Sequence, residues 1–240
     1  MILNIVEKRF EQNSLPLLNH FILEVEPESV VALVGPSGIG KSTLLRLAGG
    51  IDQQFTGNIT IDGVEAADTP PPGYVFQDPR LLPWLTALEN VRASNPNVPE
   101  ETAQTALAQV GLAKQASAYP RQLSGGMQRR LTLARALATN ARLLLLDEPF
   151  ISLDRVLVNE IRSFLANLIE AKRSTMIFVS HSAEDAACLA DRVIALAGRP
   201  ARIADDITLS VARSQRDDAT IKEYTHRLEA MTKDSCGSDT

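Results

Sequence analysis

The residues with the clearest chemical potential lie at positions 35–43, where the sequence reads Gly-Pro-Ser-Gly-Ile-Gly-Lys-Ser-Thr and fits the spacing G-x-x-x-x-G-K-[ST]. Glycines let the backbone turn tightly, so that successive N–H groups converge on a phosphate, and a helix beginning here adds the positive end of its dipole. We predict a nucleoside triphosphate site, in which Lys41 pairs with the β- and γ-phosphates and the Ser42 hydroxyl binds Mg²⁺. An ordinary glycine-rich turn is the alternative. The residues predicted to line this phosphate loop are Gly35, Pro36, Ser37, Gly38, Ile39, Gly40, Lys41, Ser42 and Thr43.

Two carboxylates, Asp147 and Glu148, follow the aliphatic run at 143–146. A phosphate loop needs an acidic residue at the end of a neighbouring buried strand to hold Mg²⁺, and Asp147 fits that position. Glu148 would orient or deprotonate a water molecule that attacks the γ-phosphate in line. A strand that ends in an acidic turn is commonplace by itself, so this interpretation depends on the phosphate loop.

The elements that position these residues alternate along the chain. Short apolar runs at 29–34, 58–61, 142–146, 175–179 and 192–196 predict strands, and periodic patterns at 42–48, 127–138 and 155–172 predict helices. This alternation is typical of an α/β fold with a largely parallel sheet. Residues 68–73 contain three consecutive prolines and predict a loop. From 79 to 138 the pattern is helical without a strand, which indicates a helical insertion, and residues 217–231 predict a terminal helix.

Composition excludes several classes of protein. The 240 residues carry 24 lysines and arginines against 29 acidic residues, a net charge of −5, so no basic excess favours nucleic acid. No apolar run approaches the roughly twenty residues that span a bilayer. The first ten residues do not have the order of charges and apolar residues of a signal peptide. Cys188 and Cys236 fit no metal spacing or disulfide framework, so a reducing cytoplasm is the expected compartment.

A third motif, Leu-Ser-Gly-Gly-Met-Gln-Arg-Arg at 123–130, narrows the class. With the two preceding motifs in order, the chain resembles the nucleotide-binding subunit of an ATP-binding cassette (ABC) transporter over about residues 5–203. The resemblance implies a P-loop NTPase (RecA-like) core with an N-terminal antiparallel β-subdomain and an inserted α-helical subdomain. We expect one ABC ATPase domain over 1–240, with the core and β-subdomain at 1–78 and 138–240 and the helical subdomain at 79–137.

This third motif at 123–130, called the signature motif below, could form a second anion site. Ser124, Gly125 and Gly126 precede a helix, so a hydroxyl and backbone N–H groups meet at its N-terminus. From the residues alone, a simple helix cap is the better-supported alternative. The resemblance implies that these residues bind the γ-phosphate of ATP held by the opposite subunit, so that two chains enclose two nucleotides head to tail.

Other site residues are assigned by the resemblance. Phe10 would stack on adenine, although by itself it would be taken for a core aromatic. Gln77 would contact Mg²⁺ and lie near the membrane partner. Asp154, in Ser152-Leu-Asp154, would belong to the D-loop. His181 would contact the γ-phosphate, although a lone histidine is more often structural. His20 and His226 match no family position and are expected to be surface or packing residues.

Residues 77–86, Gln-Asp-Pro-Arg-Leu-Leu-Pro-Trp-Leu-Thr, are similar to the branch that imports nitrate, sulfonates, taurine and thiamine-pyrimidine precursors. This implies an ATPase, with ATP and Mg²⁺ as cofactors, that acts as a homodimer peripheral to the cytoplasmic face of the (inner) cell membrane. Its partners would be integral membrane permease subunits and, indirectly, an extracytoplasmic solute-binding protein. Trp84 is expected either in a core or in the groove that receives the permease. Ile39 and Ile151 depart from the branch without removing a phosphate ligand.

Three alternatives remain. A soluble ABC-type ATPase in a non-transport complex usually joins two cassettes or carries a long coiled coil, and this chain has one cassette. An unrelated P-loop kinase or GTPase would not explain residues 123–128. A non-catalytic ATP-binding regulator would not need Glu148 and His181.

Overall fold

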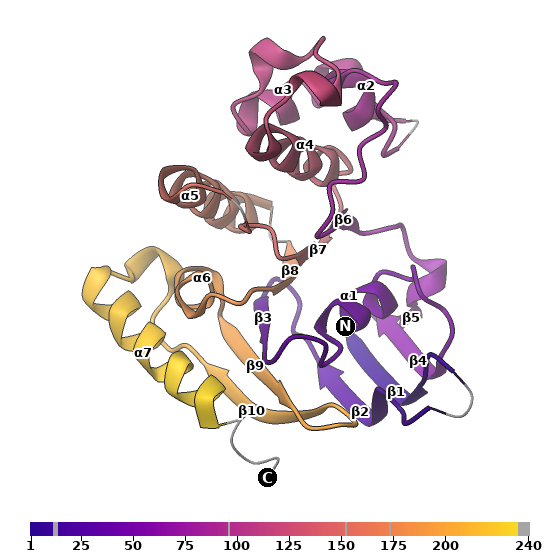
Figure 1. Ribbon diagram of the computed structural model, residues 1–240, viewed down its shortest axis with the longest axis vertical. Coiled ribbons are helices and arrows are strands. Elements are labelled where there is room, and N and C mark those ends of the chain that lie inside the picture. Colours follow the sequence, from indigo (N-terminus) through magenta and orange to yellow (C-terminus); the bar gives the residue numbers. More distant parts are fainter. Residues whose placement is uncertain (12–13, 96, 152, 173, 235–240) are drawn as a thin grey trace. The chain divides into compact units, whose positions relative to one another are not determined.

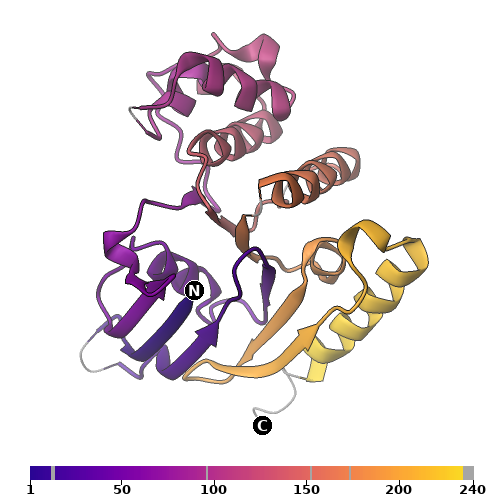
Figure 2. The same cartoon turned by 180° about the vertical axis from the view of Figure 1, so that it is seen from behind.

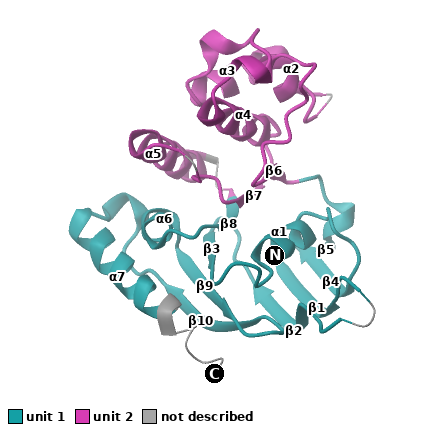
Figure 3. Cartoon of the chain, viewed as in Figure 1, with its two compact units in different colours: residues 1–71, 175–240 teal, residues 72–174 magenta. Residues whose placement is uncertain are grey.

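The computed structural model describes residues 1–11, 14–95, 97–151, 153–172 and 174–234. The chain divides into two compact units, coloured separately in Figure 3. Unit 1 contains Met1–Pro71 and Thr175–Thr240, and unit 2 contains Pro72–Ser174. The expected division into a core and a helical subdomain at 79–137 stays a prediction. Among the described residues, every helix is too short or too polar to cross a membrane.

An antiparallel sheet occupies the N-terminal part of unit 1 (Figure 1), with strand order β2-β1-β4-β5. Its strands are β1 (Ile2–Lys8), β2 (Leu18–Glu24), β4 (Thr56–Ile61) and β5 (Val64–Glu65). Asp62 and Gly63 join β4 to β5 with positive φ angles of 52° and 81°, as a two-residue hairpin turn requires. The strand expected at 58–61 is therefore confirmed, and a tight turn follows it.

Strand β1 contains an irregularity that changes which side chains face inward. Leu3 and Ile5 are buried, as period-two alternation requires. The register against β4 then shifts between Ile5 and Glu7, and His20 on β2 has a φ of 48°. Beyond this point Lys8, rather than Glu7, is buried, because a bulge re-aims the side chains that follow it.

A second sheet of unit 1 contains the buried strands that precede the predicted site residues. β9, β3 and β8 are parallel, with β3 in the middle, and β10 pairs antiparallel with β9. The strands are β3 (Val30–Val34), β8 (Thr175–Val179), β9 (Arg192–Ala197) and β10 (Arg202–Thr208). Every residue of β3 is buried, as expected for a parallel strand covered on both faces.

The helices of unit 1 are α1 (Lys41–Ala48), α6 (Ala183–Leu189) and α7 (Asp218–Asp234), with 3₁₀ turns η1 (Ala66–Asp68) and η4 (Arg213–Gln215). Helices α6 and α7 lie side by side in both views of the molecule (Figures 1 and 2) and pack on each other. Tyr224 and Leu228 of α7 are buried. The terminal helix predicted at 217–231 is confirmed.

Unit 2 combines a two-stranded parallel pair with packed helices. β6 (Gly73–Val75) pairs with β7 (Leu143–Asp147). The helices are α2 (Ala87–Arg92), α3 (Glu100–Gln109), α4 (Gly125–Ala138) and α5 (Arg155–Lys172), with 3₁₀ turns η2 (Ala113–Gln115) and η3 (Pro120–Gln122). α2, α3 and α4 pack on one another, with Val91, Leu107 and Leu131 in their shared core.

Most expected elements are found within two residues of their predicted bounds, but the segment at 68–73 differs. Asp68 ends a 3₁₀ turn and Gly73 begins strand β6, so only its middle is a loop. A Cβ on Gly73 would lie 2.7 Å from a Leu144 methyl and 2.8 Å from the Ala136 carbonyl oxygen. Glycine is therefore needed for β6 to approach its neighbours, and it is not simply the end of a loop.

Candidate functional site

The phosphate loop connects β3 to α1 in unit 1, and its glycines adopt conformations that other residues rarely adopt. Gly35, Gly38 and Gly40 have φ angles of 141°, 77° and 111°. A Cβ on Gly35 would lie only 2.5 Å from the Leu196 carbonyl oxygen of β9. Ser37 and Gly38 are exposed at the tip of the loop, whereas Ile39 is buried.

The N-terminus of α1 fits a bound phosphate. Gly40 offers no side-chain cap, and the first turn of α1 contains no acidic residue, so its first N–H groups face no competing carboxylate there. Lys41 is buried, and its ammonium donates to the carbonyl oxygens of Gly35 and Pro36, both at 2.8 Å. This places a positive charge across the base of the loop.

His181 lies in a hydrogen-bonded turn of unit 1, directly after β8. Ser182 caps α6 by accepting a hydrogen bond from the Asp185 N–H. Ser180 donates to the buried Asp185 carboxylate at 2.5 Å and accepts from the Ser182 N–H at 3.0 Å. The residues on either side of His181 are thus fixed, while its own side chain is exposed.

A cavity of about 580 Å³ in unit 1 is lined by both the start of the phosphate loop and His181. Gly35 and Pro36 form one part of its wall, and Thr225, Leu228 and Glu229 of α7 form another. The structure therefore brings together two sets of predicted site residues that are far apart in the sequence.

Phe10 follows β1 and is 68% exposed, so the alternative that it is a core aromatic is wrong. The Lys8 ammonium lies 5.4 Å from the centroid of its ring, within the range of a cation–π contact. Lys8 is only 2% exposed and bonds to Asp52 at 2.7 Å and to the Gln54 carbonyl oxygen at 2.8 Å. His20 and His226 are exposed, as expected.

The predicted carboxylates end β7 in unit 2. Asp147 is its last residue and is buried, and Glu148 follows with an unusual φ of 51°. The Gln77 side-chain amide donates to the Glu148 carboxylate at 3.3 Å. Two residues predicted to act at the same reaction centre are therefore in direct contact.

Arg129 on α4 joins the same two residues, and sequence reasoning did not identify it. Its guanidinium donates to the backbone carbonyl oxygens of both Gln77 and Glu148. Burial lowers the pKa of Arg129, although the carboxylates of Glu148, Asp147 and Asp78 oppose the shift. Its position inside the signature motif was the only signal in the sequence, and a charged residue on a helix is normally taken to be solvated.

The signature residues begin α4. Ser124 caps the helix, with its hydroxyl accepting from the Met127 N–H at 3.3 Å, so the capping role is real. Gly125 is exposed, and a Cβ there would meet no atom within 4 Å. The first turn of α4 contains no acidic residue. This helix end can therefore also receive an anion.

Two further expectations concern unit 2. Asp154 caps the start of α5, accepting from the Leu157 N–H at 3.0 Å, whereas its neighbour Ser152 lies outside the described residues, as does Cys236.

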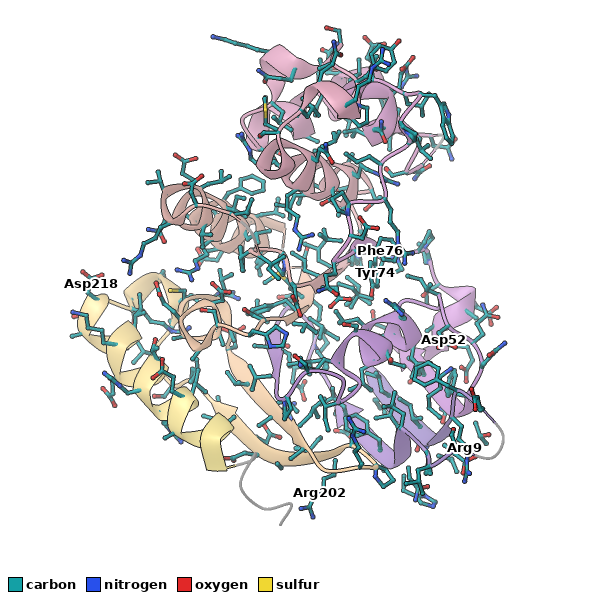
Figure 4. The ribbon with its side chains drawn as sticks, in the orientation of Figure 1. Arg9, Asp52, Tyr74, Phe76, Arg202 and Asp218 are labelled. Atoms are coloured by element: carbon teal, nitrogen blue, oxygen red, sulfur yellow. The ribbon has the colours of Figure 1, made fainter. Side chains whose placement is uncertain are left out.

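Trp84 is 69% exposed, so the alternative of a core position is wrong. Figure 4 shows Tyr74 and Phe76 of the segment around Gln77 beside each other, with ring centroids 4.3 Å apart.

Comparison with known proteins gives a consistent set of matches. A family model described as ABC transporter matches residues 18–151. The aliphatic sulfonates import ATP-binding protein SsuB 2 of Burkholderia lata is 43% identical over 86% of this chain and 77% of its own length. SsuB 1 of Pseudomonas aeruginosa is 36% identical over 97% of this chain and 96% of its own length.

Solved structures agree on the fold. The dimeric structure of MJ0796, a bacterial ABC transporter cassette, is similar with a TM-score of 0.79, at 29% identity over 88% of this chain and all of that one. A post-hydrolysis dimer of the same cassette, bound to ADP and Pi, has a TM-score of 0.78 at 28% identity, with the same coverage. The expected fold class, a P-loop NTPase with mixed α/β sheets, is confirmed.

Proposed function

Because the chain belongs to the ABC transporter family, we propose that it is the ATP-hydrolysing subunit of an importer for sulfonate-like solutes. ATP binding and hydrolysis follow from the family. The importer role and the solute class are inferred from the sulfonate import proteins that align over most of the chain. The observation that carries the proposal is the phosphate loop, where the Lys41 ammonium lies across the base of the loop and the first turn of α1 contains no acidic residue, as an anion site requires.

The residues of unit 1 would hold the triphosphate. The N–H groups of the phosphate loop and the α1 N-terminus would bind the β- and γ-phosphates, with the Lys41 ammonium neutralising their charge. His181, held by its two serine neighbours, would contact the γ-phosphate. Exposed Phe10 would stack on adenine, an interaction of about 1–3 kcal/mol by analogy with base stacking.

The residues of unit 2 would supply the chemistry. Glu148 would orient and deprotonate the attacking water, with its carboxylate held by the Gln77 amide. The oxygen donors of Ser42, Gln77 and Asp147 are of the type that Mg²⁺ prefers. When bound, Mg²⁺ would neutralise charge on the phosphate oxygens.

The remaining site residues would act across a dimer. The N-terminus of α4, with Ser124, Gly125 and Gly126, would bind the γ-phosphate held by a second copy of the chain. Asp154, which caps α5, would lie at the same subunit boundary. The dimeric state of a solved cassette of similar fold supports a dimer of this chain.

The partners follow from the importer role. We infer integral membrane permease subunits that receive the exposed surface around Trp84, and an extracytoplasmic solute-binding protein that acts through them. The subunit would then sit peripherally on the cytoplasmic face of the membrane. The import names of the relatives favour this role over a soluble ATPase in a non-transport complex.

Reconstitution tests the proposal. The protein and its permease are placed in liposomes, and ATP hydrolysis is measured with a solute-binding protein that is empty or loaded with an alkanesulfonate. We expect hydrolysis that the loaded binding protein stimulates and that Lys41→Ala abolishes. Absence of hydrolysis would contradict the ATPase role, and hydrolysis that no sulfonate affects would contradict the solute class.

A further inference from the structure

Arg129 occupies an unusual position in unit 2. It lies in the second turn of α4, five residues after Ser124, and is only 5% exposed. Its two terminal nitrogens donate to different backbone carbonyl oxygens, one on Gln77 and the other on Glu148. A planar guanidinium suits such a bridge, because its donors are fixed in a fork.

The bridge closes a ring of hydrogen bonds. The Gln77 side chain donates to the Glu148 side chain at 3.3 Å, while Arg129 holds both main chains. The segment after β6, the end of β7 and helix α4 therefore meet at one buried cation. All three belong to unit 2.

The backbone of Glu148 needs such support. Its φ of 51° is rare for a residue with a side chain, and such conformations persist only where the surroundings fix them. The carbonyl group that this conformation presents is the one that accepts from Arg129. The direction of the Glu148 side chain therefore depends on a contact made by α4.

A second arginine of α4 fixes the far side of the segment that carries Gln77. Arg135 donates to the Arg80 carbonyl oxygen at 2.9 Å, and the Arg80 guanidinium lies 4.2 Å from the centre of the Phe76 ring. Loss of Arg135 would loosen this segment without touching Glu148. It therefore offers a matched control.

We propose that Arg129 is a positioning residue that links the phosphate-binding tip of α4 to Glu148 and Gln77. Because α4 begins at Ser124–Gly126, a phosphate of the partner's nucleotide at that tip would shift or stiffen the helix, and Arg129 would pass the change to the carboxylate that acts on this chain's own nucleotide. The proposal rests on the proposed function for the roles of these residues.

The test uses two substitutions at the same position. Arg129→Met removes both donors while keeping a long side chain, and Arg129→Lys keeps the charge but not the two-pronged bridge. With the permease present, we expect kcat to fall at least tenfold in both variants, while KM for ATP changes less than threefold. Wild-type turnover in Arg129→Lys would show that the bridge is not needed and would overturn the proposal.

Hydrogen exchange gives a readout that does not depend on activity. In the nucleotide-free protein, Arg129→Met should exchange faster than wild type around both 77 and 148, whereas Arg135→Met should do so only around 80. A non-hydrolysable ATP analogue should slow exchange at 124–127 and 148–151 in the wild type, but only at 124–127 in Arg129→Met. Equal protection at 148–151 in the two proteins would contradict the link.

The two proposals fail in different ways. If wild-type protein with its permease hydrolyses no ATP, the proposed function is wrong. If the wild type is active and Arg129→Met shows the same turnover and the same exchange pattern as the wild type, only the proposed role of Arg129 is wrong. If Arg129→Met does not fold, as judged by circular dichroism, Arg129→Lys decides the question by the same measurements.

Discussion

At the scale of single residues, the phosphate loop adds the positive charge of Lys41 to the backbone N–H groups that would bind a phosphate. Lys41 is buried and donates to two carbonyl oxygens of its own loop, which hold its ammonium in place. A cation held in this way can accept a phosphate with little reorganisation. The same residue therefore stabilises the loop and prepares it for an anion.

Lys41→Ala should weaken ATP binding by about 10- to 100-fold, because a hydrogen bond to a charged group contributes about 1.5–3 kcal/mol. Fluorescence titration with a labelled ATP analogue measures the affinity. Lys114→Ala, an exposed lysine of unit 2, is the control and should bind as the wild type does. Unchanged affinity in Lys41→Ala would contradict the role of the phosphate loop.

Glu148→Gln should reduce ATP hydrolysis by about 10²- to 10⁴-fold, the usual contribution of a general base. The amide keeps the size of the side chain and can still contact Gln77, so ATP binding should persist. We expect an ATP-bound dimer to accumulate, visible by size-exclusion chromatography beside a phosphate-release assay. Wild-type turnover in this variant would remove Glu148 from its role.

At the scale of elements, some helices and strands were predictable because glycine or proline marks their ends, whereas other strands are too short or too irregular to show a pattern. β3 and α1 were predictable because an apolar run ends at Gly35 and a helical pattern begins after Gly40. Strand β6 has only three residues after three prolines, too few for a periodic pattern. β10 carries charged residues and a register shift between Ile203 and Asp205, so it shows no clean alternation.

The candidate site was also predictable only in part. The motif residues of the phosphate loop and the signature depend on local spacing, which the sequence shows directly. Arg129 and Lys8 depend on burial, which it does not show: Lys8 faces inward only because β1 is irregular after Ile5, and Arg129 is buried only because Gln77 and Glu148 come together beside α4.

The ion pair of buried Lys8 and partly buried Asp52 ties β1 to the segment that follows α1. Partial burial of Asp52 raises its pKa, but hydrogen bonds from Lys8 and the Gln54 N–H outweigh this, so the pKa lies below its ordinary value. Because the pKa of Asp52 is lower in the folded than in the unfolded protein, its ionised form stabilises the folded state at pH values above the unfolded pKa of about 3.9. This stabilisation is lost as the pH falls through the folded pKa.

Asp52→Asn should therefore lower the free energy of unfolding by about 1–2 kcal/mol at pH 7, allowing for the solvent that still reaches Asp52. Urea unfolding at several pH values measures the difference from wild type, which should shrink as the pH falls below about 4. Glu65→Gln, an exposed change in the sheet that contains Lys8, should show no such trend. A difference that stays constant down to pH 2.5 would show that the ion pair contributes nothing.

At the scale of the whole molecule, the two proposed anion sites of one chain are more than one nucleotide needs. The N-termini of α1 and α4 both lack acidic residues in their first turns, and a pair of chains can use all four ends on two nucleotides if each is enclosed head to tail. The solved cassettes of similar fold are dimeric, as an enclosure by two chains requires. A mixture of two defective chains can test which chain completes which site.

Lys41→Ala damages the phosphate loop, and Gly125→Asp places a negative charge at the tip of α4, where a Cβ meets no atom within 4 Å and an acidic residue suits the helix. Each variant alone should be nearly inactive with its permease. In an equal mixture, about half of the dimers would pair the two variants, collecting both changes in one site and leaving the other intact. Phosphate release should then rise to about a quarter of the wild-type rate. If each chain instead completed its own site, every site would carry one change, and mixing would restore nothing.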